Sequence, residues 1–314
     1  MKISCLLKIF GLFLVFTFAT YAQNQITNAE NEQILFNVTV TTKKDDLITG
    51  LKAENFKVYD EKMLQPITFF SAEDVPISIG ILVDKSASIT ETKASSVQQA
   101  LTNFVNKSHP NNEYFLMAFN TTQGLLFNNF QDNTTTLQSI KKLSAVKSQG
   151  NTNFYDAVQA SLEKVSKGKY TQKVLIIISD GQDNSSKSDF GKIKSLTKKS
   201  NVLLYTVNIS GKTGSDTPDG IQALAFSEML TKISGGKTYV PQTLVELNES
   251  FLRIADELRN QYVIGFKIAK PTEKDKKEKW REVEIKVELL PNSNNVGKPN
   301  VRSRKGYYLS AKSN

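Results

Sequence analysis

A regular alternation of strand-like and helix-like patterns between residues 77 and 259 is the strongest constraint on the fold. The strand-like runs are apolar throughout, and "KVLIIIS" (173–179) has no polar break between Val174 and Ile178. Strands that are apolar on both faces belong inside a parallel sheet that helices cover on both sides. This part of the chain therefore predicts a doubly wound α/β domain.

The pattern also predicts the elements of this domain one by one. The expected strands are 77–84, 113–120, 173–180, 201–210 and 237–240, and the expected helices are 91–107, 133–143, 154–166, 220–232 and 243–259. The run "GLLFNNF" (124–130) is expected to form a hairpin edge with 113–120.

Both flanks of this domain carry β patterns without helices. The expected strands are 34–42, a hairpin around residues 60–62 within 54–71, and then 261–268, 280–290 and 301–310. Neither flank is large enough to form a core of its own. We therefore expect residues 23–74 and 260–314 to pair into one antiparallel module, with the domain of residues 75–259 inserted between them. Two separate sheets packed on that domain would give the same pattern.

The first 22 residues have the anatomy of a secretory signal peptide. Lys2 and Lys8 precede or border a nearly unbroken apolar run at 9–18, and small residues at 20–22 supply a cleavage site. The apolar run is too short to span a bilayer comfortably. We expect a cleaved signal, a secreted or periplasmic protein, and no other membrane span. An uncleaved N-terminal anchor is the alternative.

Composition excludes several classes of function. The only cysteine, Cys5, lies in the predicted signal, so the mature chain would have no disulfide, thiolate metal site or cysteine nucleophile. The formal net charge is +9, but the basic residues are scattered apart from a run at 270–279 that also contains acidic residues. A mixed run is typical of a solvated loop, so we do not expect a nucleic-acid partner.

Oxygen-bearing side chains follow two of the predicted strands and occupy one loop. Asp84, Ser86 and Ser88 follow the strand at 77–83, Asp180 follows the strand at 173–179, and Thr152 lies in the loop "SQGNTNFYDA". Ligands of a doubly wound sheet bind beyond the carboxyl ends of its strands. Hard oxygen ligands with two formal negative charges favour Mg²⁺, with Mn²⁺ or Ca²⁺ as alternatives, over zinc or copper.

A helix cap is the simpler explanation for part of this pattern. Ser88 or Thr90 could cap the helix that begins near Glu91. A cap needs only one such residue, and it explains neither Asp84 nor a second aspartate, Asp180, at the end of the most apolar strand. The metal site therefore explains more of the pattern than the cap does.

These residues also carry a family resemblance. "DKSAS" (84–88), "GNT" (150–152) and "ISDGQDN" (178–184) resemble, in this order, the metal-ion-dependent adhesion site of von Willebrand factor type A domains. The resemblance covers about 77–259, and both flanks look like those of a secreted bacterial subfamily.

The resemblance implies a role for each residue. Ser86, Ser88 and, in the ligand-binding state, Thr152 would bind the ion directly, while Asp84 and Asp180 would hold it mostly through water. A partner protein would complete the shell with a glutamate or aspartate carboxylate.

The sequence departs from the family's pattern at two positions. Asn151 replaces the commoner second glycine of Gly-Gly-Thr, and Lys85 puts a positive charge beside the site. Asp183 is expected to be a turn or rim residue rather than a ligand.

Our leading hypothesis is a secreted, non-enzymatic, metal-dependent protein-binding module of the adhesion type. The alternative is a structural or assembly subunit of the cell envelope with a vestigial metal site. A metal-dependent hydrolase is a weaker third, because no general base can be named near the site. The only histidine, His109, lies in a loop before a strand and therefore at the opposite end of the sheet. The pattern leaves the oligomeric state open.

Overall fold

The computed structural model describes residues 33–120, 129–148, 150–211, 216–268, 278–289 and 298–309. The predicted signal peptide at 1–22 lies outside these residues, and so does most of the predicted hairpin strand at 124–130. Just after that strand, Gln131 forms an isolated antiparallel bridge with Tyr114. None of the helices in the described part of the chain is long and apolar enough to cross a membrane.

The centre of the larger half is a five-stranded parallel sheet. Its order is β6 (Glu113–Phe119), β5 (Ser78–Asp84), β7 (Lys173–Ser179), β8 (Val202–Asn208) and β9 (Lys237–Tyr239). Every residue of β5, β6 and β8 is buried, as expected for a sheet that helices cover on both faces. The predicted doubly wound α/β fold is confirmed.

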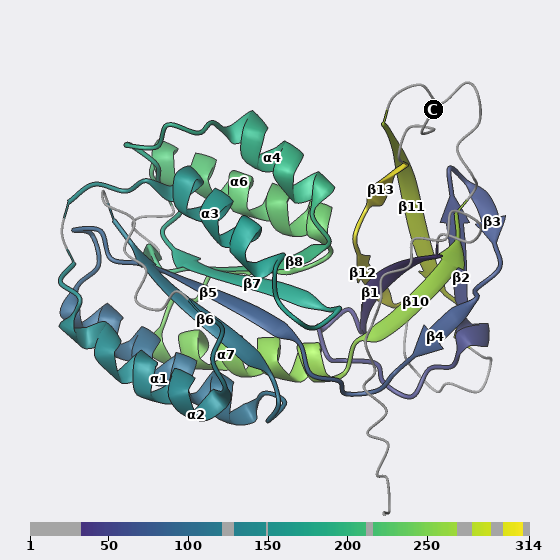
Figure 1. Cartoon of the computed structure of the whole chain (residues 1–314), viewed down its shortest axis with the longest axis horizontal. Coiled ribbons are helices and arrows are strands. Elements are labelled where there is room, and N and C mark those ends of the chain that lie inside the picture. Colours follow the sequence, from purple (N-terminus) through teal and green to yellow (C-terminus); the bar gives the residue numbers. More distant parts are fainter. Residues whose placement is uncertain are drawn as a thin grey trace, which may run out of the picture.

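Helices cover both faces of this sheet (Figure 1). One face is covered by α1 (Glu91–Lys107), α2 (Asn133–Lys141), the 3-10 turn η2 (Lys142–Ala145) and α7 (Leu244–Arg259). The other is covered by α3 (Phe154–Val165), α4 (Phe190–Lys199) and α6 (Pro218–Ser234).

The helix α4 was missed by the sequence analysis. Its apolar residues Phe190, Ile193 and Leu196 recur at helical spacing, but they are few in a short, lysine-rich stretch, and the helix buries only Ile193 and Thr197.

The flanks form two four-stranded antiparallel sheets that share one core. One sheet has the order β12 (Asn300–Ser303), β1 (Gln33–Thr41), β10 (Tyr262–Lys267) and β4 (Phe69–Ser71). The other has the order β13 (Gly306–Leu309), β11 (Lys279–Val287), β2 (Phe56–Asp60) and β3 (Met63–Gln65). Each sheet contains strands from before and after the α/β domain, so the flanks pair with each other. We call this part the β-sandwich.

Two details of the β-sandwich differ from the expected elements. The single strand expected at 301–310 is divided at Arg304 and Lys305 into β12 and β13, which belong to different sheets. A one-turn 3-10 helix, η1 (Ala53–Asn55), precedes β2. The hairpin between β2 and β3 is as expected, and Glu61 and Lys62 adopt the left-handed backbone conformation of a tight turn, with φ of 49° and 67°.

A buried polar network joins the β-sandwich to the α/β domain. Glu257 of α7 is 3% exposed. It accepts hydrogen bonds from Arg302 of β12 (2.6 Å), from Thr39 of β1 (3.0 Å) and from the hydroxyl of Tyr205 on β8. Because a buried charge requires a counter-ion, the pairing of Glu257 with Arg302 helps to fix how the α/β domain and the β-sandwich fit together.

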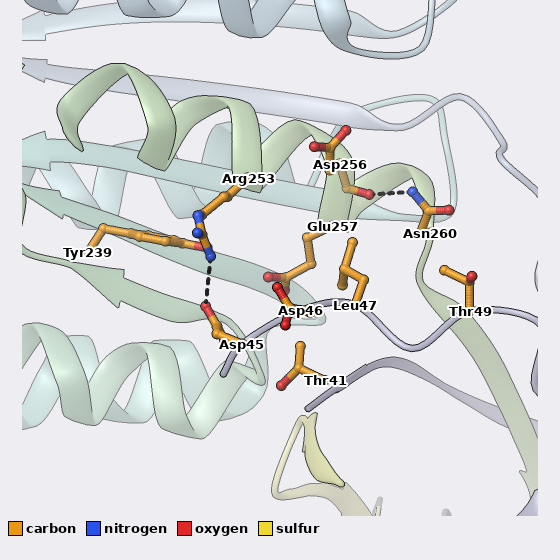
Figure 2. Close-up of a pocket in the computed structure, with 10 residues that line it drawn as sticks. All are labelled: Thr41, Asp45, Asp46, Leu47, Thr49, Tyr239, Arg253, Asp256, Glu257 and Asn260. Carbon is orange, nitrogen blue, oxygen red and sulfur yellow. Dashed lines mark hydrogen bonds and ion pairs between the residues drawn. The ribbon is translucent and has the colours of Figure 1, made fainter. Parts of the chain in front are cut away.

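A cleft of about 390 Å³ opens beside this network (Figure 2). Figure 2 shows Asp45, from the loop after β1, facing Arg253 of α7, with 3.7 Å between their charged groups. Asp256 in the same cleft pairs with Lys107 at 2.6 Å. Asp45 thus bridges the β-sandwich and the α/β domain, whereas the pair of Asp256 and Lys107 joins α7 to α1 within the α/β domain.

Candidate metal site

Two of the predicted site residues meet because their strands are neighbours. Asp84 is the last residue of β5, and Asp180 directly follows β7. The two strands run parallel, with Val83 opposite Ile178, so both aspartates emerge at the same edge of the sheet. The chain enters β5 from the side of the β-sandwich, so this edge lies at the far end of the molecule (Figure 1).

A chain of hydrogen bonds connects four of the five predicted residues. The Oγ atoms of Ser86 and Ser88 lie 3.1 Å apart, and Ser88 Oγ donates to Asp180 Oδ2 at 3.0 Å. Asp84 Oδ1 accepts the backbone N–H of Ser86 at 2.8 Å. Its other oxygen, Oδ2, accepts the hydroxyl of Ser179 at 2.6 Å. The loop after β5 is thereby tied to the end of β7.

Of the two residues named as possible helix caps, Thr90 is the cap and Ser88 is not. Thr90 caps α1, and its side chain accepts the backbone N–H of Lys93 at 3.3 Å. Ser88 instead donates to Asp180. The two serines of the Asp-x-Ser-x-Ser motif are therefore not needed to start the helix.

Thr152 lies on the loop next to these residues. The backbone N–H of Ala87 donates to the carbonyl of Gly150 at 3.3 Å, which holds the Thr152 loop against the serine loop. Thr152 is 5% exposed. The backbone N–H of Thr152 donates to Asn184 Oδ1 at 2.9 Å, and the backbone N–H of Asn184 donates to the carbonyl of Thr152 at 3.1 Å.

Sequence reasoning did not assign a role to Asn184, although it belongs to the motif that contains Asp180. Asn184 holds the backbone of the Thr152 loop and is not a proposed ligand, so the spacing of the oxygen-bearing residues in the sequence gives no sign of its role. Asp183 is also explained by loop geometry: its Oδ1 accepts the hydroxyl of Ser186 at 2.5 Å and the backbone N–H of Tyr155 at 3.3 Å. These contacts agree with its expected place in a turn or rim.

The electrostatics of this edge are unusual. Asp84 is fully buried, and burial raises the pKa of its carboxyl group, although hydrogen bonds from Ser179 and Ser86 oppose the shift. Lys85 is 4% exposed, and burial lowers the pKa of its ammonium group. A cation bound here would stabilise the ionised form of Asp84.

The donor set and its spacing fit a small divalent cation. Mg²⁺ takes six oxygens at about 2.1 Å, so neighbouring ligands of an octahedron lie about 3 Å apart. The separations along Ser86, Ser88 and Asp180 are 3.1 and 3.0 Å. The described residues contain no group of three or more histidine, cysteine or acidic side chains that could hold a metal. Hydroxyl groups would therefore supply part of the coordination shell of the cation. Hard cations accept such oxygen ligands, whereas zinc does not favour them.

His109 lies away from this edge, as its position before β6 predicts. It is in the loop between α1 and β6, and its Nδ1 accepts the backbone N–H of Asn111 at 3.1 Å.

Comparison with solved structures shows the same fold in distant proteins. The PilB minor pilin from Streptococcus sanguinis aligns with a TM-score of 0.50 and 12% identity, over 62% of this chain and 63% of that one, which is less than two thirds of its length. A D319A mutant of that pilin aligns with a TM-score of 0.50 and 10% identity, over 72% and 88% of the two chains. Identities this low establish a common fold and nothing further.

Curated protein sequences yield no match. Among protein families, that of the von Willebrand factor type A domain matches residues 78–252, from the first residue of β5 to the middle of α7. This is a family of protein-interaction and adhesion modules, and no family of enzymes is indicated. The match extends over more than half of the chain and contains all three motifs at the edge of the sheet. The protein therefore belongs to the von Willebrand factor type A domain family.

Proposed function

We propose that this protein is a metal-dependent binding module that recognises an acidic group on a partner protein. Ser86, Ser88 and Thr152 would bind a divalent cation directly, and Asp84 and Asp180 would supply the negative charge that holds it. Mg²⁺ is the expected ion, with Mn²⁺ or Ca²⁺ as alternatives. When bound, the ion supplies a positively charged position that a glutamate or aspartate side chain of the partner can occupy.

One observation carries this proposal. The hydroxyl oxygens of Ser86 and Ser88 lie 3.1 Å apart, as neighbouring ligands of one octahedral ion would, and the carboxylate of Asp180 lies 3.0 Å from Ser88 Oγ, close enough to supply charge to the same ion. Thr90, not these serines, caps the following helix. The hydroxyl groups are therefore available for a ligand.

The charge of the site supports an acidic partner. Because neutral hydroxyls rather than carboxylates would contact the ion directly, the ion stays electrophilic at its open position, so an incoming carboxylate is favoured. The proposed location is outside the cytoplasm, secreted or periplasmic, and it rests on the signal-like pattern of residues 1–22.

Thermal melting after chelation tests the cation site. The protein is stripped of divalent cations and titrated with Mg²⁺, Mn²⁺ and Ca²⁺, beside Asp84→Ala and the control Asp46→Ala. Asp46 is an exposed carboxylate of the β-sandwich. An ion that binds only the folded protein, at 100 times its dissociation constant, adds about 2.7 kcal/mol of stability.

The wild type and Asp46→Ala should gain melting temperature, and Asp84→Ala should not. No gain in any of the three proteins would contradict the metal site. A structural or assembly role that does not need the ion would then explain the molecule better.

A further inference from the structure

The first turn of α3 is capped by side chains of another loop. Asn153, the residue before α3, provides no side-chain cap for this helix. The backbone N–H of Tyr155 donates instead to Asp183 Oδ1 at 3.3 Å. The backbone N–H of Asp156 donates to Ser186 Oγ at 3.1 Å. The loop after β7 therefore accepts hydrogen bonds that the N-cap residue of a helix usually accepts.

Asp183 is the centre of this cap. Its Oδ1 also accepts the hydroxyl of Ser186 at 2.5 Å. Because the hydroxyl hydrogen of Ser186 points to Asp183, a lone pair of the same hydroxyl oxygen can accept the N–H of Asp156. Loss of the Asp183 side chain would therefore remove one hydrogen bond of the cap and allow the Ser186 hydroxyl to rotate away from the other.

The capped turn adjoins Thr152, a proposed ligand of the cation. Asn153 alone separates Thr152 from α3. The N–H of Thr152 donates to Asn184 Oδ1 at 2.9 Å, and its carbonyl accepts the N–H of Asn184 at 3.1 Å. Together with the two hydrogen bonds of the cap, these contacts tie residues 152–156 to residues 183–186.

The same loop begins with Asp180, another residue of the proposed site. Its Oδ2 accepts the hydroxyl of Ser88 at 3.0 Å. The cap therefore helps to fix the position of Thr152 relative to Asp180 and the serine loop. An oxygen ligand of Mg²⁺ lies about 2.1 Å from the ion in a nearly ideal octahedron, so the groups that hold a ligand in place affect the affinity for the ion.

We infer that Asp183 is a positioning residue of the proposed cation site: its cap on α3 holds the Thr152 hydroxyl where that oxygen can bind the ion. This inference rests on the proposed function, because it takes Thr152 as a ligand. Asp183 acts through the acceptor oxygen of its side chain and not through its negative charge. Asparagine offers the same acceptor oxygen without the charge, so it separates the two effects.

Variants of Asp183 test this role. The stripped wild type, Asp183→Ala and Asp183→Asn are titrated with Mn²⁺, and the relaxation of water protons by the bound ion is measured. This relaxation increases with the number of water molecules bound directly to the ion. Thr152→Val, which replaces the hydroxyl with a methyl group, shows the effect of losing this ligand. Asp219→Ala is the matched control, since it removes an exposed carboxylate from the first turn of α6, at the same edge of the sheet.

Asp183→Ala should bind Mn²⁺ about tenfold more weakly than the wild type, as is typical when a group that holds a metal ligand is lost. Its bound Mn²⁺ should relax water protons more strongly, because water takes the place of the Thr152 hydroxyl. Thr152→Val should show both changes, and combining it with Asp183→Ala should add little. Asp183→Asn and Asp219→Ala should remain close to the wild type in both quantities.

The outcomes separate this role from the proposal beneath it. If Asp183→Ala keeps the Mn²⁺ affinity and the proton relaxation of the wild type, Asp183 does not position Thr152, and the cation site stands. If Asp183→Asn binds as weakly as Asp183→Ala, the charge matters rather than the cap, and the inference is wrong. If the wild type does not bind Mn²⁺, both the site and the role of Asp183 are wrong.

Ser186→Ala provides a second variant if Asp183→Ala does not fold. It removes the hydrogen bond between the cap and the Asp156 N–H. It should weaken Mn²⁺ binding and strengthen proton relaxation in the same direction as Asp183→Ala, and unchanged values of both would contradict the inference.

Discussion

Asp84 combines two roles that conflict in the absence of a cation. Its carboxyl group is fully buried and accepts hydrogen bonds from Ser86 and Ser179. Burial raises its pKa. A carboxyl group whose pKa is higher in the folded state costs stability when it ionises. This loss of stability is absent below the pKa that Asp84 has in the unfolded chain, near 4. It grows as the pH rises through the higher pKa of Asp84 in the folded protein.

Asp84→Asn should therefore have effects of opposite sign with and without metal. In chelator at neutral pH, it should raise the melting temperature, since the amide can still accept from Ser86 and hydrogen-bond to Ser179 without a charge. It should also reduce the loss of stability between about pH 4 and pH 7. With Mg²⁺, it should lack the stabilisation seen in the wild type. Melting curves at several pH values measure both effects, and a lower melting temperature in chelator would contradict this account of Asp84.

At the scale of elements, the start of α3 organises the loop that follows β7. Asp156, in the first turn of α3, accepts the backbone N–H groups of Lys187 and Ser188, both at 2.9 Å. Burial acts to raise the pKa of this carboxyl group, but these hydrogen bonds outweigh it, so the pKa is lowered. The stabilisation that ionised Asp156 gives the folded protein is present above the ordinary pKa of an aspartate. It is lost as the pH falls through the lowered pKa of Asp156 in the folded protein.

Asp156→Asn should loosen this loop, because one amide oxygen replaces two carboxylate oxygens. Hydrogen exchange of the Lys187 and Ser188 amides should become faster, and affinity for Mn²⁺ should fall a few-fold although no proposed ligand is changed. Glu163→Gln, on the exposed side of the same helix, is the control and should change neither quantity. Unchanged exchange at both amides would show that Asp156 does not hold the loop.

At the scale of the whole molecule, one buried ion pair joins the two parts. Glu257 and Arg302 lie 45 residues apart in the chain and 2.6 Å apart in space. Their side chains are 4% and 23% exposed. Removing one member of a buried pair leaves an uncompensated charge and destabilises by about 3–5 kcal/mol, whereas replacing both can be nearly neutral.

Arg302→Met should therefore destabilise the protein by about 3 kcal/mol, and Glu257→Gln combined with Arg302→Met should recover much of the loss. Lys199→Met, which breaks a pair whose side chains are 52% and 54% exposed, should lower the stability far less than Arg302→Met does, because solvent screens an exposed pair. Denaturant unfolding of the four proteins measures these differences. Equal losses for Arg302→Met and Lys199→Met would show that the buried pair does not stabilise the junction.

The alternation of apolar strands and helices was enough to predict the doubly wound domain, because β5, β7 and β8 are buried on both faces and leave an unbroken apolar signal. The helix α4 gave a weaker signal, since its few apolar residues stand among lysines and it buries only Ile193 and Thr197. The division of the last predicted strand at Arg304 was also invisible. A change of sheet depends on which strands lie nearby, and not on local pattern.

The amino-acid sequence by itself determined the fold class, the family and the order of the oxygen-bearing motifs, because burial on both faces and residue spacing are local properties. Only the tertiary structure decided which of those groups meet. It showed the hydrogen bonds that link Ser86, Ser88 and Asp180, and the contact of Asn184 with Thr152. These relations join residues that are distant in the chain, so they exist only once the parallel sheet has brought its strand ends together.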